Sequence, residues 1–325
     1  MKNILVSGAS GIVGYGILRS LKASGKELRL IGTTIYEDSV AQGFCDIFEK
    51  APLTTEPAYI TWLKGIIERY QIDLLIPGIE ADLYKWAEHI TEIRKTDALV
   101  VMNNPDLVAI CRDKWIFYER LIENDTALAI PTSIDTDFDS LAERFGLPLL
   151  LKPRVGYGSK GIVRINDQQD FLKYQSGIGE IHLVQPIIGN DDEEYSTSAF
   201  CDGKGGYYAI MTIKRKLSSE GFTGKAEVVE LEQINNSVLT LCRIFKPVGP
   251  TNFQFRKQAD IFKLLEINPR ISSATSIRMA FGYNEAKMAV EYYLEKKEPK
   301  QPIIRRGRAV RYSEDFIFYE NSDNI

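Results

Sequence analysis

Residues 262–270 have the sequence FKLLEINPR, in which polar and apolar side chains alternate from Leu265 onward. In a β-strand successive side chains point to opposite faces, so Glu266 and Asn268 share one face while Leu265 and Ile267 share the other. Arg270 keeps the polar face if the strand continues through Pro269. The stretch therefore predicts a half-buried strand whose polar face carries a carboxylate, an amide and a guanidinium.

That polar face has the chemistry of a magnesium–phosphate site. A Glu carboxylate and an Asn carbonyl are hard oxygen ligands of the kind that Mg²⁺ prefers, and bound phosphates can complete its shell. In the upstream segment NFQF (residues 252–255), Gln254 alternates with apolar neighbours and could supply a third oxygen. The planar fork of Arg270 suits bidentate binding of a phosphoryl group. An exposed polar strand face is the alternative, but it leaves the regular alternation of Glu266, Asn268 and Arg270 unexplained.

A glycine-rich segment, LLLKPRVGYGSKGIVRI (residues 149–165), predicts a β-hairpin. Gly156, Gly158 and Gly161 have GxGxxG spacing, but a strand follows them, so no helix N-terminus is available for phosphate. Such a hairpin can cover a triphosphate with backbone N–H groups, because glycine permits close approach. Lys152 on the entering strand could reach the phosphates, and Arg154 and Lys160 add positive charge. A flexible surface hairpin with solvated basic residues is the alternative.

A second glycine pattern, VSGASGIVG (residues 6–14), follows a predicted strand and opens a predicted helix, the setting of a dinucleotide turn. Nicotinamide binding needs an acid at the end of the second strand, where Glu37 and Asp38 come slightly late. A tight turn that starts a doubly wound domain is the favoured interpretation. A nicotinamide-dependent epimerase or reductase is kept as an alternative, although no YxxxK pair lies in a suitable helix.

The chain divides into three parts by pattern. Over residues 1–104 predicted strands alternate with predicted helices, which indicates a Rossmann-like parallel sheet and makes the fold class α/β combined with α+β. The strands are predicted at Asn3–Ser7, Leu28–Gly32, Leu74–Pro77 and Ala98–Met102, and the helices at Val13–Ala23 and Ala58–Tyr70. Residues 105–188 contain predicted helices at Asp113–Ile122 and Asp137–Phe145 and the glycine hairpin. Residues 189–325 are strand-rich, with a helix at Asn284–Leu294 and a terminal edge strand or hairpin at Ile303–Tyr319.

In this order the motifs resemble the ATP-grasp superfamily, and most of all its carbamoyl-phosphate synthase large-subunit type. The resemblance covers roughly residues 1–300. It is carried by Asp113-Lys114, Lys152 with the glycine hairpin, Gln185-Pro186-Ile187-Ile188-Gly189, Glu194-Tyr195-Ser196, Gln254 and Glu266-Ile267-Asn268-Pro269-Arg270. It implies a pre-ATP-grasp domain over 1–104, a small lobe with a glycine-rich flap over 105–188, and a large lobe with the metal site over 189–325.

The resemblance also implies cofactors and residue roles. ATP and Mg²⁺ would be the cofactors, with Mn²⁺ as an alternative metal. The nucleotide would contact Lys114, Lys152, Gly156, Gly158, Ser159, Gly161, Gln185, Pro186, Ile187, Ile188 and Glu194, with residues 185–188 reading adenine and Glu194 holding the ribose. Gln254, Glu266 and Asn268 would hold the metal, and Arg270, Lys152 and Lys214 would be catalytic. Arg278, Arg308 and Arg311 are further candidates for the substrate end.

The implied activity is that of a carboxylate–amine ligase, which activates a small carboxylate as an acyl phosphate and transfers it to an amine. A nucleotide-binding module without catalysis is another alternative. Carbamoyl-phosphate synthase itself is not expected, because the chain has one grasp half and no glutaminase pattern. The resemblance implies a homodimer.

Composition narrows the class further. The chain has 325 residues, with 40 basic against 44 acidic side chains and a formal net charge of -4, a balance unsuited to coating nucleic acid or an anionic membrane. No apolar run is long enough to span a bilayer, and the N-terminus lacks a signal-peptide pattern, so a cytoplasmic location is expected. The four cysteines are far apart in the sequence and there are only two histidines, so we do not expect a zinc site, disulfides or a Ser-His-Asp hydrolase.

Overall fold

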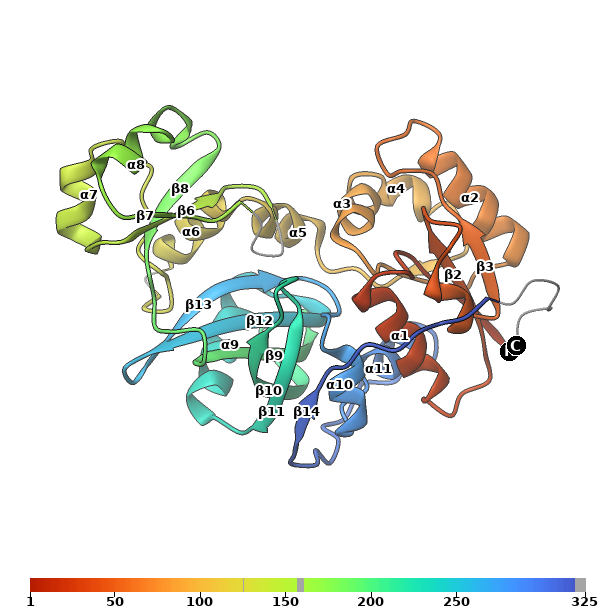
Figure 1. Cartoon of the computed structure of the whole chain (residues 1–325). Coiled ribbons are helices and arrows are strands. Elements are labelled where there is room, and N and C mark those ends of the chain that lie inside the picture. Colours follow the sequence, from red (N-terminus) through yellow and green to blue (C-terminus); the bar gives the residue numbers. More distant parts are fainter. Residues whose placement is uncertain (125, 157–160, 319–325) are drawn as a thin grey trace.

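Three β-sheets organise the described part of the chain (Figure 1). The structure is a computed structural model that describes residues 1–124, 126–156 and 161–318. A five-stranded sheet belongs to the N-terminal part, a three-stranded sheet to a small middle lobe, and a six-stranded sheet to the large C-terminal lobe. The predicted combination of α/β and α+β architecture is confirmed.

The N-terminal sheet is parallel throughout, with strand order β3-β2-β1-β4-β5. Apolar strand residues such as Ile4, Leu5 and Val6 are fully buried because helices cover both faces. The strands are β1 (Lys2–Val6), β2 (Leu28–Thr34), β3 (Ile47–Lys50), β4 (Leu74–Ile76) and β5 (Leu99–Val100). The helices are α1 (Ile12–Lys22), α2 (Tyr59–Tyr70), α3 (Glu80–Glu88) and α4 (Ile90–Ile93), with a 3-10 turn at Val40–Gly43.

Close packing accounts for the N-terminal glycine turn. A Cβ on Gly14 would lie 2.3 Å from the carbonyl oxygen of Gly8, and Gly8 itself has a φ of +55°. At the end of β2, where a ribose-binding acid would be needed, the hydroxyl of Thr34 hydrogen-bonds to that of Ser10 at 2.7 Å. These contacts favour the interpretation as a tight strand–helix turn.

The small lobe is built on the antiparallel sheet β7-β6-β8, and it has its own core, which includes Leu149, Leu151, Phe171 and Val184. Strands β6 and β7 form the predicted hairpin, whose tip residues Gly158, Ser159 and Lys160 lie outside the described residues. The strands are β6 (Leu149–Pro153), β7 (Val163–Ile165) and β8 (His182–Pro186). Helices α7 (Phe138–Phe145) and α8 (Gln168–Leu172) pack on this sheet, with a 3-10 turn at Gln175–Gly177. Helices α5 (Pro105–Arg112) and α6 (Lys114–Glu123) precede them and pack into the core of the large lobe.

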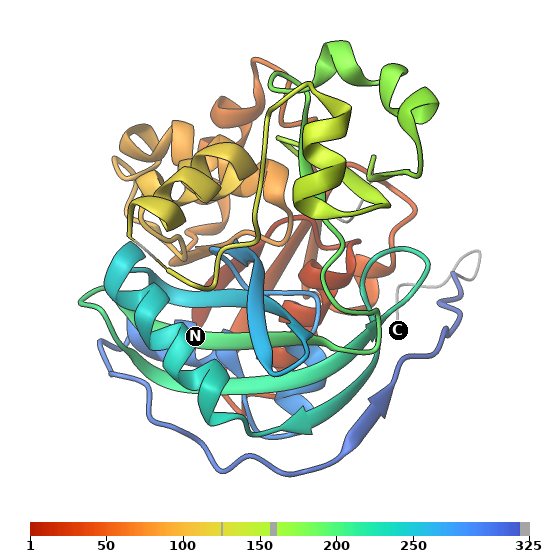
Figure 2. The same ribbon diagram turned by 90° about the vertical axis from the view of Figure 1, so that its left-hand side faces the viewer.

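The large lobe carries an antiparallel sheet in the order β13-β12-β9-β10-β11-β14, with the small lobe above it in Figure 2. One sheet face packs on α9, and the other packs on α10, α11 and α1. The strands are β9 (Glu194–Asp202), β10 (Tyr207–Leu217), β11 (Thr223–Val229), β12 (Val248–Gln258), β13 (Ile261–Asn268) and β14 (Arg308–Val310). The helices are α9 (Glu232–Phe245), α10 (Thr275–Ala280) and α11 (Glu285–Tyr293).

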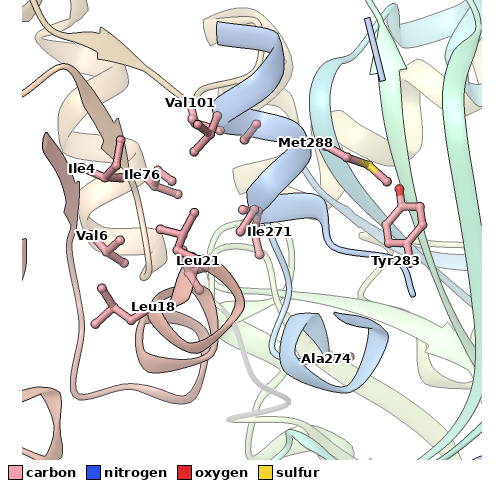
Figure 3. Packing of buried hydrophobic residues seen from close by; sticks show 14 of the residues in the cluster. Ile4, Val6, Leu18, Leu21, Ile76, Val101, Ile271, Ala274, Tyr283 and Met288 are labelled. Carbon is pink, nitrogen blue, oxygen red and sulfur yellow. The ribbon is translucent and has the colours of Figure 1, made fainter. Parts of the chain in front are cut away.

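A single hydrophobic cluster joins the N-terminal sheet to the large lobe (Figure 3). Ile4 and Ile76 come from the parallel sheet, Leu18 from α1, and Tyr283 and Met288 from the segment around α11. All five are buried. The N-terminal sheet is therefore held against the large lobe by a shared core.

Helix α9 lies inside the strand-rich third part and is an element that the strand pattern does not predict. Of the predicted edge strand or hairpin at 303–319, the edge strand is present over Arg308–Val310, which pairs with β11, and the chain then leaves the sheet. Figure 1 shows this last segment passing α1, and Phe316 packs against Gly43 of the N-terminal domain. No described helix is long and apolar enough to cross a membrane.

Candidate functional site

A cleft lies between the small-lobe sheet and the large sheet and is bounded at one end by the N-terminal domain. One compartment, of about 360 Å³, is lined by Glu80, Lys114, Glu266 and Arg270. A second compartment, of about 660 Å³, continues along the small lobe, and both contain Lys152 and other shared lining residues. The two predicted halves of the site thus face one continuous cleft.

The second compartment has an apolar section whose shape and chemistry suit a planar nucleobase. It is lined by Ile130, Leu150, Ile162, Ile187 and Leu265, which come from both lobes. Pro186 and Ile188 of the expected hinge also line it. Apolar walls with a few placed polar groups are typical of cofactor sites.

Leu265 reaches this section because of a β-bulge. Gln254 pairs with Glu266 and Phe255 pairs with Leu264, so Leu265 has no partner on β12. A bulge lets two successive side chains point to the same face. The expectation that Leu265 points away from Glu266 is therefore wrong: Leu265 lines both compartments and Glu266 the first, while Leu264 is packed in the large-lobe core.

Gln185 presents a free acceptor at the boundary of the two compartments. The hydroxyl of Thr132 donates its proton to the carbonyl of Ile130 at 2.9 Å, so it can only accept from Gln185 Nε2, at 2.8 Å. This fixes the amide orientation. Gln185 Oε1 is buried and has no hydrogen-bond partner among the described residues, so it is available to a donor on a ligand.

Two lysines supply positive charge on the small-lobe side. Burial lowers the pKa of Lys152 to about 8, although the carboxylate of Glu266 opposes the shift. Burial also lowers the pKa of Lys114, whose Nζ donates to the carbonyl of Gly156 at 3.0 Å. Lys152 forms no ion pair with any described residue. Arg154, in contrast, is paired with Asp113 at 2.7 Å and ties the hairpin to α6.

The three predicted metal ligands lie side by side on the large sheet. Gln254 and Glu266 are cross-strand partners, and Asn268 is two residues beyond Glu266. Glu266 Oε1 accepts from Asn268 Nδ2 at 2.8 Å, and Gln254 Oε1 accepts from Arg215 Nη2 at 2.6 Å. One carboxylate and two amides fit a Mg²⁺ ion that takes its remaining ligands from phosphate and water.

Arg270 lies at the end of the cleft next to the N-terminal domain. It forms an ion pair with Glu80, which opens α3 directly after β4, and donates to Asn268 Oδ1 at 3.2 Å. Both Arg270 and Glu80 line the cleft. The predicted phosphoryl-binding arginine is thus adjacent to the metal ligands and held by a carboxylate from another domain, a contact that the sequence did not indicate.

Glu194 is the centre of a buried ion-pair cluster. Its carboxylate accepts from Arg215 at 2.6 and 2.9 Å and from Arg256 at 2.7 Å, and it is 3% exposed. It lines both compartments, where a ribose contact is expected. Burial alone would raise the pKa of Glu194, but the two arginines outweigh it and hold the pKa below its usual range.

We expect Glu194→Gln to lower the free energy of unfolding by about 3 kcal/mol at pH 7, because it leaves two guanidinium groups without their carboxylate. The contribution of Glu194 is present above the pKa of an unfolded Glu and is lost as pH falls through its lower folded value. Urea unfolding at pH 7 and pH 4 should therefore show a larger difference between wild type and variant at pH 7. A difference between wild type and variant that is the same at both pH values would contradict the structural role of this cluster.

Lys214 does not line the cleft. Its Nζ pairs with Glu193 at 2.6 Å and lies 5.8 Å from the centroid of the Tyr195 ring, on the opposite face of β10. The next residue, Arg215, points into the cleft. The structure therefore does not place Lys214, predicted as catalytic, at the cleft, because strand alternation puts only Arg215 of the two on the cleft face.

The other candidate arginines also lie outside the cleft lining. Arg278 is fully buried beside Glu285, and Arg308 is on the edge strand β14. Arg311 donates to the carbonyl of Ser273, which does line the cleft. Gly156 lines the cleft, and Gly161, on the far side of the hairpin tip, has a φ of +74°.

Two antiparallel sheets face each other across a cleft that Lys152 lines from the small lobe and Glu266 and Asn268 line from the large lobe. Residues 182–316 match the family model described as "ATP-grasp in the biosynthetic pathway with Ter operon". The likeness to ATP-grasp proteins and to carbamoyl phosphate synthase large chains that the motifs predict is thereby confirmed.

The sequence relatives include carbamoyl phosphate synthase large chains, and several solved structures share the fold. The chain is 24% identical over 348 residues to the carbamoyl phosphate synthase large chain of Agathobacter rectalis, an alignment that covers 95% of this chain and 32% of the relative. The chain thus spans about a third of that protein's length. Its fold resembles N5-carboxyaminoimidazole synthetase from Staphylococcus aureus complexed with ADP (TM-score 0.72, 16% identity, 93% and 80% of the two chains). It also resembles biotin carboxylase from Campylobacter jejuni in a β-γ-ATP complex (TM-score 0.74, 14% identity, 94% and 74%).

Proposed function

We propose that the chain is an ATP- and Mg²⁺-dependent ligase that activates a small carboxylate as an acyl phosphate and joins it to an amine. The observation that carries the proposal is the convergence of Lys152 with Glu266, Asn268 and Arg270 on one cleft. A cationic strand on one side and oxygen ligands on the other can hold a metal-bound triphosphate between them. The names of the related proteins, all of the ATP-grasp class, support the same chemistry.

The proposed reaction has two steps. A carboxylate oxygen of the substrate attacks the γ-phosphorus, the bond to the β–γ bridging oxygen breaks, and ADP leaves. The amine then attacks the acyl carbon, and the bond to the phosphate oxygen breaks, so that inorganic phosphate leaves and the amine loses a proton. Mg²⁺ held by Gln254, Glu266 and Asn268 would neutralise phosphate charge.

The protein contributes position and electrostatics to both steps. Lys152, on the small lobe, would hold phosphate oxygens. Arg270, on the large lobe, would bind the transferred phosphoryl group, which would replace Glu80 as the partner of its guanidinium. Closure of the hairpin would keep water from the acyl phosphate. Glu220 lines the cleft on the loop between β10 and β11 and is a candidate acceptor for the amine proton.

The proposal is tested by ADP and phosphate release with ATP, Mg²⁺ and paired panels of carboxylates and amines. ADP release that requires both substrates, with formation of the amide product by mass spectrometry, is the expected result. A protein that binds ATP but releases no ADP with any pair would be the nucleotide-binding module considered above. Tight binding of NADH in place of ATP would instead support the epimerase or reductase alternative.

We also expect Gln185 to select adenine over guanine. The free Oε1 can accept from the 6-amino group of adenine, whereas guanine presents an oxygen at that position, which leaves two acceptors facing each other. Gln185→Leu should reduce the ratio of ADP to GDP affinity at least tenfold, measured by calorimetry with both nucleotides. Gln185→Glu keeps an acceptor and should retain the preference. An unchanged ratio in the leucine variant would exclude side-chain recognition by Gln185.

A further inference from the structure

Asn252 is a fully buried polar side chain next to the proposed metal site that the proposed mechanism does not use. It lies on β12, two residues before Gln254 and on the same face, and it pairs across the sheet with Asn268. Gln254 Nε2 donates to Asn252 Oδ1 at 3.3 Å. The side chain of Asn252 is thus in direct contact with a metal ligand.

The hydrogen bonds around Asn252 permit only one orientation of its amide. Its Nδ2 donates to the backbone carbonyl of Thr197 at 3.1 Å and to the hydroxyl of Ser196 at 2.9 Å. A carbonyl cannot donate, so the NH₂ group must face Thr197. Ser196 Oγ is kept as an acceptor by Arg278, whose Nη2 donates to it at 2.8 Å and which is donor-only.

The fixed orientation of the Asn252 amide in turn fixes the orientation of the Gln254 amide. Because Asn252 Oδ1 is directed at Gln254, only the NH₂ end of the Gln254 amide can face it, and the oxygen must point the other way, where it already accepts from Arg215 at 2.6 Å. A flipped Gln254 would place two oxygens against each other at Asn252 and offer an NH₂ group to the cation. An amide nitrogen of this kind has no lone pair to give to Mg²⁺.

We propose that Asn252 is a positioning residue that turns the amide oxygen of Gln254 toward the metal, and that Ser196 and Arg278 hold Asn252 in that orientation. The inference rests on the proposed function, because it assumes that Gln254 is a metal ligand. A carboxylate would present an oxygen to the metal in either orientation, but the glutamine amide has an oxygen at one end and an NH₂ group at the other. A residue that fixes the orientation explains how Gln254 can serve as a metal ligand. It also gives the buried Arg278 a role distinct from contact with the substrate.

The test compares the effect of one substitution in two backgrounds, using Mn²⁺ affinity in the presence of ADP measured by electron paramagnetic resonance. Asn252→Leu should weaken Mn²⁺ binding about tenfold in the wild-type background, the lower end for loss of a residue that orients a metal ligand. In a Gln254→Glu background the same substitution should change the affinity less than twofold, because a carboxylate presents an oxygen in either orientation. Urea unfolding of each variant reports any general loss of structure.

Thr212→Ala is the matched control. Thr212 is buried on β10 and shares a hydrogen bond of 2.9 Å with the hydroxyl of Thr197 on the other face of the sheet, and it makes no contact with Asn252 or Gln254 in the described hydrogen bonds. It should leave Mn²⁺ affinity within twofold, whereas Ser196→Ala should weaken it. If Asn252→Leu weakens Mn²⁺ binding equally in both backgrounds, Asn252 only supports the fold and the inference is overturned. If Gln254→Leu and Glu266→Gln leave Mn²⁺ affinity unchanged, the metal site of the proposed function is itself wrong.

Discussion

Replacing Glu266 by alanine is expected to lower the rate of ADP release at least a thousandfold, a loss of about 4 kcal/mol of transition-state stabilisation. Glu266 is the one carboxylate among the three predicted metal ligands, and it lies between Asn268 and Gln254 on the polar face of the large sheet. Without it, the site keeps two neutral amides, which bind a divalent cation weakly. The measurement is steady-state ADP release with ATP, Mg²⁺ and the substrate pair identified in the screen.

Glu193→Gln is a matched control for this prediction. Glu193 precedes β9 and pairs with Lys214 on the face of the sheet away from the cleft. Its loss should change ADP release by less than twofold. Comparable losses in the Glu193 and Glu266 variants would show that general sheet stability, and not metal binding, limits activity.

Nucleotide affinity is expected to fall as pH rises through about 8. Lys152 has a pKa of about 8 in the free protein because it is buried, and a bound phosphate favours its charged form. The protonated lysine therefore binds ADP more tightly. Affinity should be greatest below pH 8 and should weaken by up to tenfold per pH unit above it, with proton uptake on binding detectable by calorimetry in buffers of different ionisation enthalpy.

Variants at the same position separate charge from shape. Lys152→Met should weaken ADP binding about a hundredfold at pH 7 and remove the pH dependence. Lys152→Arg should also flatten the pH profile, because a guanidinium stays charged, while it retains part of the affinity. Lys214→Met, which changes a lysine outside the cleft, should leave both affinity and profile as in wild type. A pH dependence that persists in Lys152→Met would assign the titration to another group.

Local alternation was enough to predict that Glu266 and Asn268 share one face of a strand. Strand pairing brings Gln254 beside them, and Lys152 and Gly156 line the same cleft from the small lobe. These features depend on residues that are close together in the sequence, so the spacing of their side chains along one strand can be predicted without knowing the fold. The parallel N-terminal sheet was predicted for the same reason, since each strand and helix carries its own pattern.

Features that depend on pairing between distant segments were not predicted. The bulge that turns Leu265 into the cleft is a property of β12 and β13 together, and no signal in residues 262–270 marks it. The phase of β10, which selects Arg215 over Lys214, is set by its register with β9. The contact of Glu80 with Arg270 joins residues 190 positions apart. The residue pattern within one strand does not indicate its register with a neighbouring strand or its contacts with distant segments.

The shared core of Figure 3 has a mechanical consequence. Burying Ile4 and Ile76 in one cluster with Tyr283 and Met288 makes the N-terminal sheet and the large lobe a single body, since separating them would expose fully apolar surface to water. The sheet β7-β6-β8 with α7 and α8 keeps its own core within residues 138–184, whereas α5 and α6 pack into the core of the large lobe. The part with its own core can therefore swing as a unit at little hydrophobic cost. Ligand-driven changes in amide hydrogen exchange should accordingly concentrate where its two connecting segments meet the rest of the chain.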